Sequence, residues 1–286
     1  IEPELRVQLK DHPEYKVRSS HGYFAPDDKA LAKAAEKDAK QKQKMDEERS
    51  KNPLLAQKYD KEARADAAKI ALSSLYPLRG IPVEMSVDYV DSGKGSSFAL
   101  ILAHLKMNEA RFQVVGDRYN ADIEVFGAVY NEKGDPVDSF SQTAQMRLKR
   151  DTLEQILGNG LVFQRRIQLN PGHYQVRLGI RNAGSSQLGS NFAWVDIPDM
   201  SKKSLVLSSI FLATEKDQID PLKDKGEKRL EEQAPAKAPT QVAKTFKRGD
   251  KFDYTVFAYN VKQDKNGNPD AVVQTQVYYG KKIVMA

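Results

Sequence analysis

Three strand-like segments follow one another between Pro171 and Leu212, with turn residues between them. The first segment alternates apolar and polar side chains. Its apolar set is Tyr174, Val176, Leu178 and Ile180, and its polar set is Gln175, Arg177 and Arg181. A period of two is typical of an antiparallel strand with one buried face. No grouping of catalytic side chains lies in this stretch, so it indicates an architecture and not an activity.

Further strand-like segments precede this stretch, and turn residues divide them too. Residues 98–103 are apolar on both faces, which predicts a central strand. Residues 131–136 predict a hairpin turn, and residues 151–157 predict a short helical turn. The predicted strands are 83–89, 98–103, 122–130, 137–148, 161–169, 174–180, 188–197 and 204–212. Short strands at this spacing predict a mainly β fold, specifically an immunoglobulin-like or fibronectin-like β-sandwich.

Two charged helices are expected before the sandwich. The first covers residues 29–49, begins after the acidic turn Pro26-Asp27-Asp28, and has only a thin apolar face. Asn52-Pro53 ends it, and residues 54–75 predict a second helix. The apolar stripe of this helix is Leu55, Tyr59, Ala63, Ala67 and Ile70. A stripe of this kind predicts that the second helix packs on another element.

The two ends of the chain differ from its centre. Residues 1–25 predict a hairpin that ends an upstream domain, and a start at Ile1 predicts a longer precursor. Residues 246–260 and 271–279 predict a strand pair around a turn at 264–269. The predicted order is an upstream hairpin (1–25), a charged helical segment (26–75), a β-sandwich (76–213), a linker (214–244) and a partial second β-sandwich (245–286).

Charge and composition exclude several classes of protein. The formal net charge is +6, but 45 basic residues are interspersed with 39 acidic ones, which argues against a nucleic-acid-binding stripe. The chain has no cysteine, so disulfides and thiolate metal sites are excluded. Its apolar runs are too short to cross a bilayer, so no transmembrane segment is expected.

Candidate catalytic and metal-binding residues are few. The four histidines, His12, His21, His104 and His173, each stand beside a strand or turn without a nearby paired carboxylate in the sequence, which favours structural roles. Asp264, Asn266 and Asn268 alternate as in a calcium loop. However, Pro269 replaces the glycine that an EF-hand needs, and Thr275 replaces the last glutamate. We therefore predict a plain turn there, and no catalytic, cofactor or metal site.

Aromatic residues offer one further candidate site. Trp194 could form a platform for sugar rings together with other aromatic side chains. Those side chains are Phe192, Tyr119, Tyr130 and the Tyr278-Tyr279 pair. A single tryptophan on a sandwich strand more commonly packs into the core, and this second interpretation is favoured.

The order of several segments resembles the von Willebrand factor A-related proteins of Acidobacteria, in the region that follows their A domain. The segments that carry the resemblance are RSSHGYFA at 18–25, PLRGIPV at 77–83, GAVY at 127–130, GDPV at 134–137, GHYQVR at 172–177, DMSK at 199–202, LVLSS at 205–209, FKRGD at 246–250 and YN at 259–260. Members of this family that bind a metal use an Asp-x-Ser-x-Ser site early in the A domain. This chain has no such sequence, so the resemblance places any such site upstream of Ile1.

The resemblance implies an extracytoplasmic location, in the periplasm, at the cell surface or secreted, and a role in protein contacts. We therefore predict a non-catalytic interaction or scaffold protein, with no cofactor, that serves as an accessory subunit of a cell-envelope or membrane-associated complex. Its partners would be other proteins and not nucleic acid. One alternative is a carbohydrate-binding or adhesion module. A second alternative is a set of accessory domains of an enzyme whose active site lies upstream.

Overall fold

The computed structural model describes residues 53–92, 97–185, 187–214, 239–246 and 249–285. The predicted hairpin at 1–25, the first charged helix at 29–49 and most of the predicted linker at 214–244 lie outside the described residues. The chain divides into two compact units, residues 1–63 and 64–286. Helix α2 (Pro53–Ser73) crosses this division, and everything below concerns the second unit.

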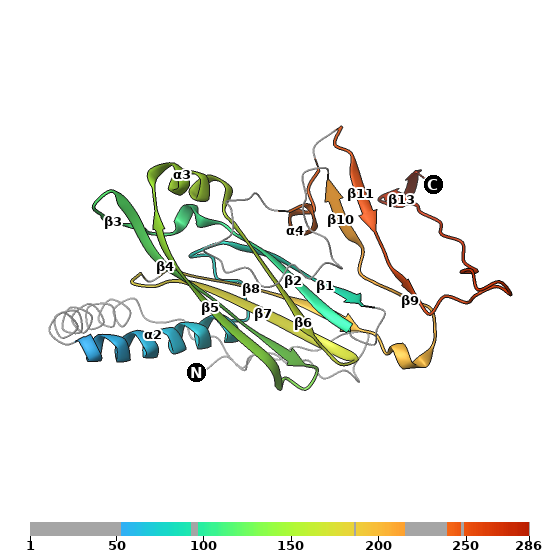
Figure 1. Ribbon diagram of the computed structural model, residues 1–286, viewed down its shortest axis with the longest axis horizontal. Coiled ribbons are helices and arrows are strands. Elements are labelled where there is room, and N and C mark those ends of the chain that lie inside the picture. Colours follow the sequence, from blue (N-terminus) through green and yellow to red (C-terminus); the bar gives the residue numbers. More distant parts are fainter. Residues whose placement is uncertain (1–52, 93–96, 186, 215–238, 247–248, 286) are drawn as a thin grey trace, which may run out of the picture. The chain divides into compact units, whose positions relative to one another are not determined.

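Two antiparallel sheets form a β-sandwich, so the fold is mainly β, as predicted (Figure 1). The smaller sheet has the order β1 (Val83–Asp91), β2 (Ser97–Leu105), β6 (Leu161–Gln168). The larger sheet has the order β3 (Gln113–Val115), β4 (Arg118–Asn131), β7 (Gly172–Asn182), β8 (Leu188–Ile197), and β5 (Pro136–Leu148) also pairs with β4. Strand β2 lies between β1 and β6, which confirms the prediction of a central strand.

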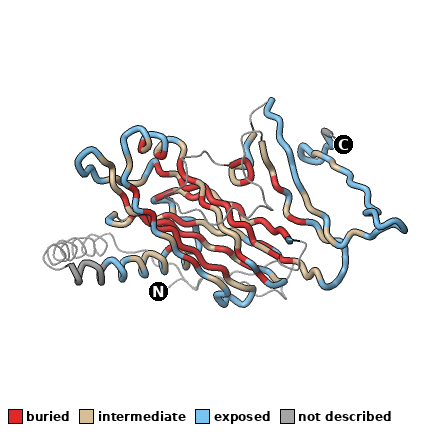
Figure 2. The backbone as a smooth tube through the Cα atoms, in the orientation of Figure 1, coloured by how far each residue is buried: buried red, intermediate tan, exposed pale blue. Residues whose placement is uncertain are grey.

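The main core lies between the two sheets. The predicted apolar face of β7 is buried in it through Tyr174, Val176, Leu178 and Ile180. Phe140 of β5 stacks on Phe163 of β6, with ring centroids 5.7 Å apart, and so joins the two sheets. Gly127 lies under the Phe140 ring, and a Cβ atom at this position would be only 2.3 Å from that ring, so a larger residue would clash. Figure 2 shows that buried residues follow the strands of these two sheets.

Residues 64–73 of helix α2 pack on the outer face of the larger sheet, but not through the predicted stripe. Ile70 is exposed, so the stripe is wrong at this position, whereas Ala71 is buried. A Cβ atom on Gly179 would lie 2.9 Å from the Ala71 methyl group. The helix therefore approaches the sheet closely where alanine meets glycine, and bulky apolar residues would hold it away.

Short helices connect the strands. Helix α3 (Arg150–Asn159) joins β5 to β6 and confirms the predicted helical turn, although it is longer. It ends at Gly160, whose φ of 75° lies in the left-handed region that favours glycine. Two 3₁₀ turns are η1 (Met107–Glu109) and η2 (Met200–Lys202). None of the described helices combines the length and apolar character needed to cross a membrane.

The predicted strand 204–212 is interrupted in the structure. Strands β9 (Val206–Leu207) and β10 (Phe211–Thr214) flank Ser208 and Ser209 and join neither sandwich sheet. The Ser208 hydroxyl accepts a hydrogen bond from the Phe257 N–H (2.9 Å), and the Ser209 N–H donates to the Tyr89 carbonyl (3.1 Å). These bonds lead successive residues to different partners, so one continuous strand cannot form.

The expected pairing of 246–260 with 271–279 is also wrong. Strand β11 (Phe252–Thr255) pairs with β10, and β12 (Ala258–Tyr259) pairs with β9. Strand β13 (Val277–Tyr279) pairs with β14 (Lys282–Met285). The pairings of β11 and β12 depend on contacts with residues 206–214, and the local sequence pattern does not reveal such distant contacts. The domain boundaries named above stay predictions.

A second apolar cluster lies on the outside of the smaller sheet. It contains Val90, Leu100 and Phe211, with Phe98 and Phe257 packed against it. Helix α4 (Thr240–Ala243), at the end of the predicted linker, lies beside this cluster. The Gln241 side chain accepts a hydrogen bond from the Leu212 N–H (2.6 Å) and donates to the Ile210 carbonyl (3.3 Å). Part of the predicted linker is therefore docked on the sandwich.

Candidate functional site

Strand register arranges the outer face of the larger sheet in rows that run across the strands. Tyr130 of β4 is opposite Gln175 of β7, and Gln175 is opposite Trp194 of β8. The next row toward the end of the sheet contains His173 and Asp196, which are also opposite each other. Residues two apart on a strand share a face, so all five side chains lie on the same side of the sheet. We call these five residues the open rows.

Arg177 marks the border between the open rows and the part of the sheet that α2 covers. Its Nη1 donates hydrogen bonds to the carbonyl oxygens of Leu72 (2.7 Å) and Ser74 (2.9 Å), at the end of the helix. Its guanidinium also lies over the Phe192 ring, 5.4 Å from the centroid. A cation at a helix C-terminus satisfies carbonyls that have no partner within the helix and interacts favourably with the helix dipole. Arg177 therefore holds the end of α2 on the sheet.

Beneath α2, the sheet carries a buried ion pair. Arg181 Nη1 donates to Glu124 Oε2 at 3.0 Å, across the register pair of β4 and β7, and both side chains are about one tenth exposed. Arg64 of α2 approaches the other oxygen of Glu124, at 3.8 Å. These charges join the helix to two strands and serve the architecture.

Trp194 is exposed, and its expected place in the core is wrong. Its exposed fraction is 62%, whereas Val195 and Ile197 point into the core. Phe192 and Tyr130 share its face and are half-buried. Tyr119 lies at the far end of β4, opposite Leu148, and Tyr278 and Tyr279 belong to β13. The structure therefore brings together three of the predicted platform residues and separates the others.

His173 has a carboxylate partner, contrary to the prediction from the sequence. Its Nδ1 lies 2.5 Å from Asp196 Oδ1, and both side chains are exposed. The hydrogen bond to Asp196, followed by the charges of Asp196 and Glu132, raises the pKa of His173. Twenty-three residues separate the pair, so only the register of β7 with β8 reveals it.

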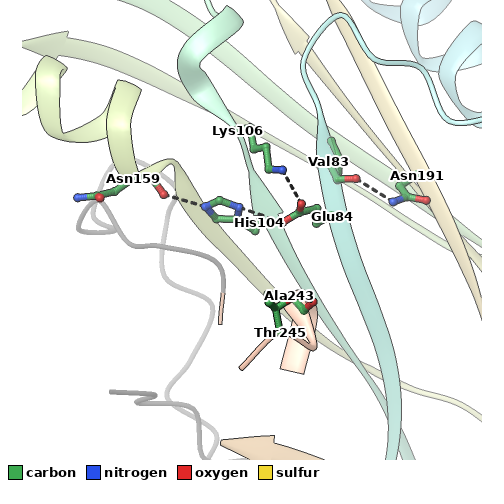
Figure 3. Close-up of polar contacts among 8 residues, drawn as sticks. All are labelled: Val83, Glu84, His104, Lys106, Asn159, Asn191, Ala243 and Thr245. Atoms are coloured by element: carbon green, nitrogen blue, oxygen red, sulfur yellow. Dashed lines mark hydrogen bonds and ion pairs between the residues drawn. The ribbon is translucent and has the colours of Figure 1, made fainter. Parts of the chain in front are cut away.

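His104 also has a carboxylate nearby, and its role is structural, as expected (Figure 3). This buried side chain donates from Nε2 to the Asn159 carbonyl (2.8 Å), because a carbonyl can only accept. Its Nδ1 lies 3.6 Å from Glu84 Oε2, and Glu84 pairs with Lys106 at 2.5 Å. The imidazole therefore ties β2 to the end of α3. His12 and His21 lie outside the described residues.

The loop at Asp264 forms a tight turn, as the sequence predicted. Asp264 Oδ1 accepts hydrogen bonds from the backbone N–H groups of Asn266 (2.8 Å) and Asn268 (2.9 Å). The bond from the Asn268 N–H, followed by that from the Asn266 N–H, lowers the pKa of Asp264. Within the described ranges, no three metal-ligating side chains come together in a group that could hold an ion.

Asp88 is a buried carboxyl group beside α4. It is 8% exposed, and its Oδ2 makes no hydrogen bond. Burial raises the pKa of Asp88, and the smaller opposing effects come from the side chains of Gln241 and Ser86 and from the charge of Lys244. The protonated form is therefore favoured by folding.

Asp88→Asn is expected to stabilise the protein near neutral pH. A raised carboxyl pKa contributes stability below the unfolded value of 3.8, and this contribution is lost as pH rises through the folded pKa. The substitution should add about 1 kcal/mol to the free energy of unfolding near neutral pH, and the gain should shrink toward acid. Urea unfolding at several pH values measures this. A gain that grows toward acid would contradict it.

Comparison with known proteins gives little similarity. No family model and no curated protein matches the chain. Among solved structures, Bacteroides uniformis β-glucuronidase aligns at 11% identity and a TM-score of 0.26, over 40% of this chain and 13% of that chain. A calcium-binding mutant of Bacteroides uniformis β-glucuronidase 2 aligns at 10% identity and a TM-score of 0.26, over 48% and 14%. This chain thus spans less than one sixth of the length of either enzyme.

Proposed function

We propose that this chain is a non-catalytic, extracytoplasmic protein–protein interaction or scaffold protein, an accessory subunit of a cell-envelope or membrane-associated complex. One observation carries the proposal. Residues 271–276, AVVQTQ, pair with no strand in the described part of the structure, and Val272 and Val273 are 97% and 78% exposed. β-Branched residues favour strands, so this segment is suited to form a strand when it pairs with a strand of a partner.

Further exposed apolar side chains follow in β13 and β14, where Tyr278 is opposite Ile283. Tyr278 and Tyr279 of β13 are 56% and 83% exposed, and Ile283 of β14 is 46% exposed. Tyrosine is enriched at protein interfaces, because its ring supplies contact area and its hydroxyl a hydrogen bond. We call Val272, Val273, Tyr278, Tyr279 and Ile283 the C-terminal apolar strip. A partner that adds a strand there would cover this strip and satisfy its backbone groups.

The structural contacts of four buried or half-buried charged and titratable groups support a non-catalytic role. Glu124 and Arg181 hold two strands together, Arg177 holds the end of α2, and His104 ties β2 to α3. Each of these groups has a structural contact that a reacting substrate would have to displace. Support for the extracytoplasmic location comes from the resemblance to the von Willebrand factor A-related proteins, through segments such as GHYQVR at 172–177.

Val273→Glu tests the proposal, with Val114→Glu as its matched control. Both valines are highly exposed, so neither substitution should unfold the chain. We expect Val273→Glu to reduce recovery of a stoichiometric partner from native membranes by about tenfold, because the interface would then bury a charge. Val114→Glu should recover the partner like the natural chain. Equal recovery with both variants, or no partner for the natural chain, would contradict the proposal.

A further inference from the structure

The open rows combine one solvent-exposed indole with polar groups on the same face of the sheet. Trp194 is the only tryptophan of the chain, and Gln175 separates it from Tyr130 on the same row. Neighbouring strands are about 4.8 Å apart, so the Cα atoms of Tyr130 and Trp194 are separated by about 10 Å. This width suits a small ring that lies against Trp194 and reaches the polar groups beside it.

Charges next to Trp194 are largely matched within the protein. His173 and Asp196 pair with each other at 2.5 Å. Arg177 is engaged with the carbonyls of Leu72 and Ser74, and Glu132 adds its charge on the side of His173. A site whose nearest charges cancel has no electrostatic preference for a charged peptide or a lipid headgroup. An uncharged ligand therefore matches this site best.

The polar groups of the open rows match hydroxyl groups of a ligand. The Gln175 Oε1 accepts from Arg177 Nε at 2.8 Å, which fixes the amide and directs its NH₂ group away from Arg177. Asp196 keeps a second carboxylate oxygen as an acceptor, and His173 keeps Nε2. The open rows therefore offer both donors and acceptors on the same face as the indole, which suits a molecule with several hydroxyls.

We propose that the open rows are a binding site for a neutral saccharide. A pyranose ring stacks its C–H face on the Trp194 indole, and its hydroxyls bond to Gln175, Asp196 and His173. This site is separate from the C-terminal apolar strip and does not depend on the proposed function.

Tryptophan fluorescence tests the site directly, because Trp194 is the only tryptophan in the sequence, so all tryptophan emission comes from the site. The probes are cellohexaose, xylohexaose, mannohexaose and chitohexaose, with a polygalacturonate oligomer as the charged comparison. We expect at least one neutral probe to shift the emission with a Kd of about 1 mM or lower, and the charged oligomer to leave it unchanged.

Substitutions that leave Trp194 in place distinguish binding at the open rows from a non-specific change in Trp194 emission. Gln175→Ala and Asp196→Ala should each weaken binding by about fivefold or more. Asp117→Ala, an exposed carboxylate on the turn between β3 and β4, should not change it. Val273→Glu should bind the saccharide normally even where it loses the protein partner. No emission change with any neutral probe up to about 10 mM, or unchanged affinity in Gln175→Ala and Asp196→Ala, would overturn the inference.

Discussion

Gly189→Ala is expected to reduce the free energy of unfolding by about 3 kcal/mol or more. A Cβ atom at this position would lie 1.8 Å from the Ile81 carbonyl oxygen and 2.9 Å from an Ile180 methyl carbon. Residues 78–81 run beside the start of β8, where the Gly80 N–H donates to the Leu188 carbonyl and the Ser190 N–H donates to the Leu78 carbonyl, both at 3.0 Å. The obstructing atom belongs to the backbone, so no rotamer change relieves the clash.

Urea unfolding measures this loss, and Gly158→Ala is the control. Gly158 lies on the exposed side of α3 with open space around its Cα, so alanine there should stabilise the protein by about 0.5–1 kcal/mol through helix propensity. An unfolding free energy for Gly189→Ala equal to that of the natural chain would show that β8 and residues 78–81 do not pack as described.

Arg181→Met should cost about 3–5 kcal/mol, because it leaves the Glu124 carboxylate buried without its closest partner. Arg64, 3.8 Å away and 39% exposed, offers only partial compensation. The double variant Glu124→Leu with Arg181→Met should recover most of this loss, since it removes both buried charges.

The exposed pair Arg150 and Glu154 provides the comparison for that experiment. Its side chains are 77% and 64% exposed, so Arg150→Met should leave the free energy of unfolding nearly unchanged. A loss for Arg181→Met no larger than for Arg150→Met would contradict the burial of the Glu124 pair. A double variant less stable than Arg181→Met would contradict the origin assigned to the loss.

Local patterns predicted the sandwich because each strand carries its own signal. The alternation in 174–180 and the two-faced apolar run at 98–103 identify β7 and β2 without reference to the rest of the chain. The packing face of α2 could not be predicted in this way. It depends on Gly179, a residue more than 100 positions away, which allows Ala71 to approach the sheet.

Only part of the candidate site could be predicted from the sequence. Trp194 alternates with Val195 and Ile197 and shares a face with Asp196. This parity could have revealed an outward side chain, although a core position was predicted. The pairing of His173 with Asp196, and the row from Tyr130 to Trp194, depend on which residues of β4, β7 and β8 are opposite each other. Register between strands is a property of the folded sheet, so these neighbours were not evident from local spacing.

Site-specific photo-crosslinking in the native cell tests the proposed interaction most directly. A benzophenone amino acid at Val272 reports on the C-terminal apolar strip, and the same group at Val114 reports on an exposed valine of β3. We expect position 272 to give one dominant crosslinked protein that position 114 does not give. No crosslinked product from position 272, or the same product from both positions, would contradict a protein-binding role for this strip.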